Sequence, residues 1–223
     1  MKTYPMFARL EGRACLVVGG GAVAERKVKD LLLAGAQVTV VSPNFTSTLM
    51  ELAARGEIQL RHEPFRAAQI TGQTLVIGAT NDPEVNARVS AVARGQGIWV
   101  NIVDAPELCS FIVPAQVRRR DLTVAIGTGG ASPALARRLR QDLEDYLDSG
   151  YGRYLEILQA VRERLLAVRR GHADNAELFS RLVDSPLKEA LAEPDLQQAR
   201  AILQEILGEV LDASSLTALL PKT

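Results

Sequence analysis

Three consecutive glycines, Gly19 to Gly21, lie between an apolar run and an amphipathic stretch. The run before them, residues 14–18, is entirely apolar, which is typical of a strand buried on both faces of a parallel sheet. The stretch after them, residues 23–33, mixes apolar and charged residues at helical spacing and ends before a glycine. Residues 19–24 also obey GxGxxA, the spacing that brings helix N-terminal amides against a pyrophosphate. This context predicts a dinucleotide site at Gly19 and Gly21, with a purely structural turn as the alternative.

Strand and helix patterns continue to alternate over about the first 105 residues. Further strands are predicted at residues 37–41, 58–61, 74–78 and 98–103, and helices at 47–55 and 83–94. Such alternation is typical of an α/β domain with a doubly wound parallel sheet, the Rossmann fold. We therefore predict a nucleotide-binding Rossmann domain over residues 1–113.

Polar residues follow the fourth and fifth predicted strands, at the carboxyl edge where this fold binds ligands. Ala79, Thr80 and Asn81 are predicted to line the cofactor site. Asn81 or Asp82 is equally suited to cap the helix that follows, and both roles are compatible. Asp104 follows the fifth strand, where a nicotinamide ring would lie, and the alternative for it is a turn-capping role.

The end of the second strand departs from the usual dinucleotide pattern. An acid commonly stands here and holds the adenosine ribose, but this chain has Ser42-Pro43-Asn44. The strand therefore does not decide between NAD and NADP.

The pattern changes after residue 110. Two apolar runs, residues 111–117 and 122–126, flank charged residues 118–121 and predict two strands joined by a turn. From Ser132 onward the chain is almost wholly helical in pattern, and residues 214–223 are expected to be weakly ordered. We divide this part into a middle β segment, residues 114–145, and a C-terminal helical domain, residues 146–223.

A second glycine loop, Thr128 to Ser132, precedes the first of these helices. Its backbone amides and the helix N-terminus suit an anion, with a simple capped helix start as the alternative. Six nearby arginines are candidate carboxylate ligands, although a solvated turn or helix face is the favoured explanation for any single one. They are Arg118, Arg119, Arg120, Arg137, Arg138 and Arg140.

Composition excludes several function classes. Lys plus Arg and Asp plus Glu number 26 each, so the chain lacks the basic excess of a nucleic-acid-binding protein. We see neither a membrane span nor a signal peptide, and we expect a cytoplasmic location. The two cysteines, Cys15 and Cys109, and the two histidines, His62 and His172, are isolated, so no protein-built metal site is predicted.

With these residues laid out, the chain resembles the precorrin-2 dehydrogenase family, the NAD-dependent module also found at the N-terminus of multifunctional siroheme synthases. The resemblance extends over about residues 1–210 and its segments occur in family order. They are Val17-Val18-Gly19-Gly20-Gly21-Ala22-Val23-Ala24-Glu25-Arg26-Lys27, Ala79-Thr80-Asn81-Asp82, Asn101-Ile102-Val103-Asp104-Ala105-Pro106, Ser110-Phe111-Ile112-Val113-Pro114-Ala115 and Gly129-Gly130-Ala131-Ser132-Pro133-Ala134-Leu135-Ala136-Arg137.

The resemblance implies an activity and an assembly. Members of this family oxidise precorrin-2 to sirohydrochlorin with hydride transfer to NAD⁺, and bifunctional members also insert Fe²⁺ to give siroheme. It further implies a homodimer formed through the middle β segment and the helical domain. Nothing in the sequence decides whether this chain inserts iron.

The resemblance also implies roles for individual residues. Asp104 matches an aspartate credited with proton chemistry, and Thr128 stands where some members carry a serine near the substrate, which leaves regulation there undecided. The positions matching cofactor contacts are Ala22, Val23, Pro43, Asn44, Ile102 and Val103. The predicted substrate-binding residues are Ser110, Thr128, Gly129, Gly130, Ser132 and Arg137.

The chemistry agrees with these assignments. Oxidation of precorrin-2 removes a hydride and a proton from a carboxylate-rich molecule, so a site needs a hydride acceptor, a base and anion-binding donors. The glycine turn, Asp104 and the arginines are the respective candidates. The alternative from another class is a dinucleotide-sensing regulatory module without catalysis.

Overall fold

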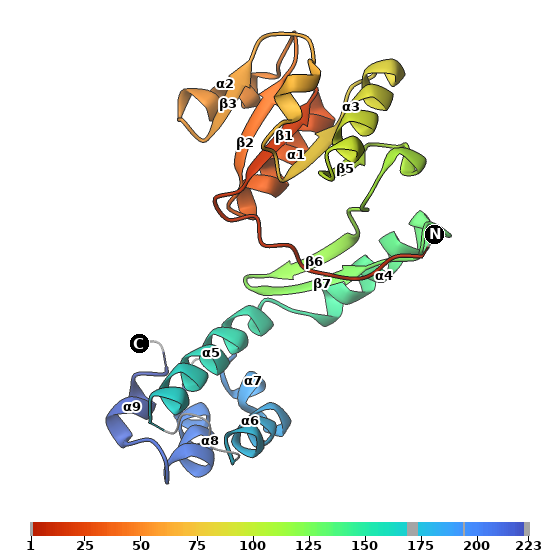
Figure 1. Cartoon of the computed structure of the whole chain (residues 1–223). Coiled ribbons are helices and arrows are strands. Elements are labelled where there is room, and N and C mark those ends of the chain that lie inside the picture. Colours follow the sequence, from red (N-terminus) through yellow and green to blue (C-terminus); the bar gives the residue numbers. More distant parts are fainter. Residues whose placement is uncertain (1, 169–173, 194, 221–223) are drawn as a thin grey trace. The chain divides into compact units, whose positions relative to one another are not determined.

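The computed structural model describes residues 2–168, 174–193 and 195–220. The chain divides into two compact units, residues 1–113 and 114–223, shown in Figure 1. The division of the second unit into a dimerisation segment and a helical domain stays a prediction.

The first unit is a five-stranded parallel sheet, in the order β3-β2-β1-β4-β5. Its strands are β1 (Ala14–Val18), β2 (Gln37–Val41), β3 (Ile58–Arg61), β4 (Leu75–Gly78) and β5 (Trp99–Ile102). The connecting helices are α1 (Ala22–Leu33), α2 (Ser47–Ala54) and α3 (Pro83–Gly95), with short 3-10 turns η1 (Ala67–Ile70) and η2 (Pro106–Leu108). The predicted Rossmann fold is confirmed.

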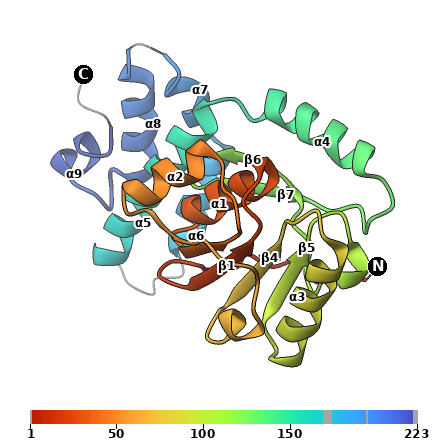
Figure 2. The ribbon, with the colours of Figure 1, turned by 90° about the horizontal axis from the view of Figure 1, so that it is seen from above.

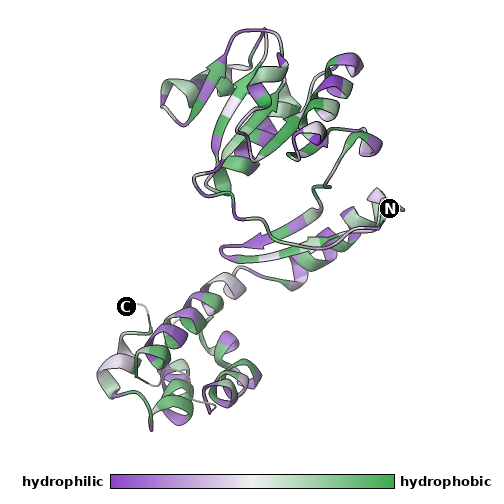
Figure 3. Ribbon diagram, in the orientation of Figure 1, coloured by the Kyte–Doolittle hydropathy of each residue, from purple (hydrophilic) through white to green (hydrophobic). Residues whose placement is uncertain are grey.

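The core of this unit has two layers because successive residues of a strand point to opposite faces of the sheet. Cys15 and Val17 of β1 pack with α1 and α2, whereas Leu16 and Val18 pack with α3 and η1. Figure 2 shows α1 and α2 on one side of the sheet and α3 on the other, and Figure 3 shows mainly hydrophobic strands. Burial on both faces explains why β1 is an unbroken apolar run.

The second unit begins with an antiparallel pair, β6 (Ala115–Arg119) and β7 (Leu122–Ile126). The prediction of residues 118–121 as the turn was wrong in part, because Arg118 and Arg119 pair with β7 and only Arg120-Asp121 turns. The left-handed backbone of Arg120, with φ of 54°, makes this turn tight.

Helices follow: α4 (Pro133–Tyr146), α5 (Gly150–Val168), α6 (Asp174–Asp184), α7 (Leu187–Ala190), α8 (Gln197–Leu207) and α9 (Ala213–Thr217). Helices α5 to α9 share one hydrophobic core. The expected weak order of the tail was wrong for residues 214–220, since Leu216, Leu219 and Leu220 are buried in that core. Among the described residues no helix is both long and apolar enough to cross a membrane.

Candidate functional site

A cavity of about 580 Å³ lies over the glycine turn of the first unit. Its walls come from residues 18–21, 41–46, 64–65 and 79–82, with Val85. These segments follow β1, β2, β3 and β4, because parallel strands bring their carboxyl ends to one edge of the sheet. The volume lies within the range of small-molecule and cofactor sites.

The three glycines serve different purposes. A side chain at Gly19, whose φ is 124°, would collide with the Ala79 carbonyl, and one at Gly20 would collide with the Asn44 carbonyl. Gly21 has an ordinary φ of −86°. No atom of the described residues, its immediate neighbours aside, lies within 4 Å of the place where its Cβ would be. Packing within the protein therefore does not require glycine at position 21. A ligand that approaches the backbone at this position would require it, because a side chain would occupy the ligand's place.

The start of α1 is suited to an anion. Gly21 caps the helix without a side-chain hydrogen bond, so the first amides of α1 are left for a ligand. Glu25, the acid of the first turn, accepts from Lys29 Nζ at 2.5 Å and from Thr46 Oγ1 at 2.9 Å. The hydrogen bonds from Lys29 and Thr46 lower the pKa of Glu25, and Lys29 offsets its charge next to the anion site.

The loop after β2 is hydrogen-bonded to the glycine turn. The Thr46 backbone N–H donates to the Gly20 carbonyl at 3.0 Å, and its hydroxyl accepts from Leu49 N, which caps α2. Pro43 and Asn44, predicted to contact the cofactor, are thereby held in the cavity wall.

The loop after β4 combines the two roles considered for it. Asp82 caps α3, since its carboxylate accepts from the N–H groups of Glu84 at 2.9 Å and Val85 at 3.2 Å. Thr80 is tied to Asn86, whose side-chain nitrogen donates to the Thr80 carbonyl at 2.9 Å. Asn81 also lines the cavity, and its side chain makes no hydrogen bond within the part of the chain that the structure describes.

Asp104 is exposed in the turn that follows β5. Its φ is 59°, in the left-handed region that aspartate and asparagine tolerate best among non-glycine residues. Its carboxylate accepts no hydrogen bond from any residue in the described ranges, and η2 has no side-chain cap, so a capping role finds no support. Burial lowers the pKa of the half-buried Lys27, and the charges of Asp30 and Asp104 oppose that shift.

Other predicted residues of the first unit lie outside the cavity lining. Ala22 and Val23 are exposed on the first turn of α1, and the Val103 side chain packs against the core. Ile102 is 2% exposed, so the residue is buried in the core of the unit. Ser110 bonds to β5: its Oγ accepts from Val100 N at 2.8 Å. Cofactor and substrate roles for these residues stay predictions.

The second glycine loop belongs to the second unit. Gly129 and Gly130 have φ of 62° and 85°, and Ser132 caps α4 by accepting from Leu135 N at 3.1 Å. The Thr128 hydroxyl accepts from Ser132 N at 3.4 Å. The capped helix start is therefore present, and substrate binding by this loop stays a prediction.

Most of the candidate arginines have partners inside the protein. Arg120, Arg138 and Arg140 pair with Glu156, Asp142 and Glu144, respectively. Arg119 bonds backbone carbonyls at the end of α4. Of the six, Arg118 and Arg137 alone have side chains without a hydrogen bond or ion pair to any described residue.

The described residues contain no group of three or more His, Cys, Asp or Glu side chains that could hold a metal ion. His62 packs edge-on against Phe45, with ring centroids 4.6 Å apart. His172 lies outside the described residues.

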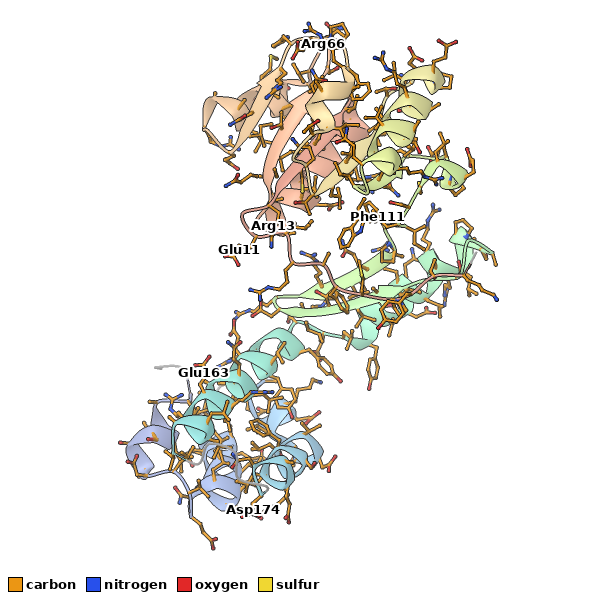
Figure 4. All side chains as sticks on the ribbon, in the orientation of Figure 1. Glu11, Arg13, Arg66, Phe111, Glu163 and Asp174 are labelled. Atoms are coloured by element: carbon orange, nitrogen blue, oxygen red, sulfur yellow. The ribbon has the colours of Figure 1, made fainter. Side chains whose placement is uncertain are left out.

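Two aromatic walls of the cavity were missed by sequence reasoning. Phe45 and Phe65 line it, and the Arg88 guanidinium lies 5.9 Å from the centre of the Phe65 ring. The adjacent Arg66, at the edge of the unit in Figure 4, pairs with Glu63 at 3.0 Å. Phe65 could have been predicted from the sheet topology. It follows β3, and residues after β3 reach the same edge of the parallel sheet as residues after β1 and β4.

Comparisons with known proteins agree with a nucleotide-binding first unit. A family described as "Putative NAD(P)-binding" matches residues 6–115, and one described as "Sirohaem biosynthesis protein central" matches residues 119–146. Together they cover more than half of the chain.

Several curated relatives are siroheme synthases. That of Methylobacillus flagellatus is 42% identical over 212 residues, which are 93% of this chain and 44% of the relative. That of Ectopseudomonas mendocina is 46% identical over 214 residues, which are 96% of this chain and 41% of the relative. The chain thus spans less than half the length of these relatives. Among solved structures, SirC, a precorrin-2 dehydrogenase, matches with a TM-score of 0.78 and 29% identity, over 92% of this chain and all of that one.

Proposed function

The chain belongs to the siroheme-biosynthesis family marked by these two matched models, and from this premise we propose that it is a precorrin-2 dehydrogenase. It oxidises precorrin-2 to sirohydrochlorin and passes the hydride to NAD⁺. The observation in this structure that carries the proposal is the cavity at Gly21, where the protein leaves room that only a ligand requires. The substrate follows from the likeness to SirC, whose whole length this chain matches.

The residues of the cavity fit a dinucleotide. The uncapped amides at the start of α1 would hold the pyrophosphate, and Pro43, Asn44 and the rings of Phe45 and Phe65 would enclose the adenosine. When bound, NAD⁺ supplies the hydride acceptor of the reaction.

Asp104 is the proposed base. The oxidation removes two hydrogens from the substrate, one as a hydride and one as a proton, and a carboxylate can accept the proton. The Asp104 carboxylate is exposed and not engaged by hydrogen bonds from the described residues. Its left-handed backbone costs about 1 kcal/mol, a strain often found at functional turns.

The proposed contacts to the substrate carboxylates lie in the second unit. Gly129 and Gly130 lie in the loop before α4, and Arg137 on that helix is exposed, with no side-chain partner among the described residues. Arginine binds carboxylates through two parallel hydrogen bonds, which suits a substrate rich in these groups.

We also propose that the protein acts as a homodimer through residues 114–145. The β6–β7 pair has only two strands, and α4 buries none of its own residues. Leu135 and Leu139 of α4 are 50% and 40% exposed. A second copy of this segment would cover these apolar side chains.

Turnover tests the proposed function directly. The chain is incubated without oxygen with precorrin-2 and NAD⁺, and the spectra of NADH and sirohydrochlorin are recorded. Equal formation of both is the expected result. NAD binding without turnover would instead support a regulatory module. Fe²⁺ added afterwards shows, through the siroheme spectrum, whether the chain also inserts iron.

A further inference from the structure

A cysteine thiol spans the turn that carries Asp104. Cys109 follows η2, and its Sγ lies 3.1 Å from the Ile102 nitrogen and 3.3 Å from the carbonyl oxygens of both Ile102 and Ala105. The sulfur accepts from the Ile102 N–H, and the S–H donates to one of the two carbonyls. Ile102 and Ala105 are the first and last residues of the turn, so the side chain bonds to both of its ends when the S–H donates to the Ala105 carbonyl.

The turn has few other bonds that fix its shape. Val103 N–H donates to the Gly78 carbonyl at 2.9 Å, and Ala105 N–H donates to the Ile102 carbonyl at 3.3 Å. A left-handed non-glycine residue persists only where its surroundings enforce that conformation. Among the residues that the structure describes, the Cys109 thiol is the side-chain group that bonds to this turn from outside it.

Cys109 is itself held firmly. Arg94 of α3 donates to the Cys109 carbonyl at 2.8 Å, and the Ser90 hydroxyl donates to the neighbouring Leu108 carbonyl at 2.6 Å. The Asn101 side-chain nitrogen donates to the Cys109 sulfur at 3.5 Å and to the carbonyl of Phe111, labelled in Figure 4, at 3.1 Å. The thiol therefore links the Asp104 turn to a segment that is anchored on α3 and β5.

We propose that Cys109 is a positioning residue, which holds the turn from Ile102 to Ala105 so that the Asp104 carboxylate faces the substrate. This inference rests on the proposed function, since it concerns the base of that reaction. Burial raises the pKa of the Cys109 thiol, so the sulfur keeps its proton at neutral pH and remains a donor.

Two replacements and two controls test it. Cys109→Ala removes every sulfur bond, and Cys109→Ser restores a group that can donate and accept. Ser90→Ala is the matched control, because it loses an anchor of the same segment without touching the turn. Cys15→Ala removes the other cysteine, which is buried in β1 and has a pKa raised to about 11 by burial.

Steady-state kinetics are measured below the unfolding temperature of every variant. We expect Cys109→Ala to lower kcat about tenfold, with the KM for NAD⁺ changed less than about twofold, since a small misplacement of a reacting group slows the chemical step. Cys109→Ser should recover most of the rate, and both controls should stay within about twofold of the unmodified protein. Equal kcat values for Cys109→Ala and Ser90→Ala would overturn the inference.

A second measurement does not depend on activity. Amide hydrogen exchange at Ala105 should be about tenfold faster in Cys109→Ala than in Ser90→Ala, because the turn opens locally. If the unmodified protein fails to oxidise precorrin-2, the proposed function falls and the exchange rates still report whether the thiol holds the turn. If the protein is active but exchange at Ala105 is unchanged, the positioning role is wrong.

Discussion

At the residue scale, Gly21 differs from Gly19 and Gly20 in what a side chain would meet. The first two positions face backbone carbonyls, whereas Gly21 faces open space in the cavity. Gly19 and Gly20 are therefore both needed for the turn to fold. Gly21 is needed for a ligand to approach the backbone.

The Gly21→Val variant should separate these requirements. We expect it to fold normally, because its φ of −86° suits any residue. It should bind NAD at least about a hundredfold more weakly, because the valine occupies the place of the pyrophosphate. Calorimetry measures the affinity, and Gly95→Val, which also meets open space but lies outside the cavity, is the control. A folded variant with unchanged NAD affinity would rule out this binding mode.

Asp104→Asn tests the proposed base. Asparagine keeps the size of the side chain and tolerates the left-handed backbone, so NAD affinity and thermal stability should persist. Precorrin-2 oxidation should fall by about a hundredfold or more, the usual effect of losing a positioned acid–base group.

The control for this variant is Glu107→Gln, which neutralises another exposed acid three residues further along the chain. Its oxidation rate should match that of the unmodified protein. A near-normal rate for Asp104→Asn would mean that solvent or the substrate itself accepts the proton.

At the element scale, Arg119 of β6 donates hydrogen bonds to backbone carbonyls at the C-terminal end of α4. The Arg119 side chain donates from Nε to the Leu147 carbonyl at 2.5 Å and from Nη2 to the Glu144 carbonyl at 2.7 Å. The last carbonyls of a helix have no partner within it, and a cation there also complements the helix dipole.

Arg119→Leu should accordingly destabilise the second unit by about 1–3 kcal/mol, the cost of leaving such acceptors without their charged donor. Urea unfolding followed by circular dichroism measures the loss. Arg118→Leu is the matched control on the same strand, because the Arg118 side chain is exposed and has no partner among the described residues, and its effect should stay within about 0.5 kcal/mol. Equal effects of the two substitutions would contradict the helix-end role.

At the scale of the whole molecule, residues 114–145 include two exposed leucines of α4, Leu135 and Leu139. An isolated two-stranded pair is marginally stable in water, and α4 contributes no buried residue to support it. These properties fit a segment that is completed by a second chain.

Sedimentation at about micromolar concentration should therefore show a dimer, in line with interfaces built on self-complementary apolar patches. Replacing both Leu135 and Leu139 by glutamate should shift the protein to monomers, because charges would face the partner's apolar side chains. Leu33→Glu, at a 73% exposed leucine of the first unit, should leave the dimer intact. A fully active monomer of the unmodified chain would disprove the proposed assembly.

The amino-acid pattern alone predicts the Rossmann fold, the glycine turn and the helical character of the C-terminal part. These features depend on residues close together in the chain, where apolar spacing and glycine reveal the local backbone. Asn81 was expected at the carboxyl edge of the sheet from its place after a strand, and Pro43 and Asn44 were expected at the cofactor from the family resemblance. All three line the same cavity, and their contact with a cofactor stays a prediction.

The folded structure was needed to distinguish side chains that bond within the protein from side chains that are available to ligands. It showed Phe65 in the cavity wall, Arg119 at a helix end, the buried tail around Leu219 and the Cys109 sulfur at the Asp104 turn. The first three depend on contacts between segments distant in sequence, and such contacts are set by packing rather than by local pattern. The sulfur contact instead depends on the direction of one side chain across a short turn. A free arginine and an arginine that closes a helix have the same local sequence signal, and only the fold gives them different partners.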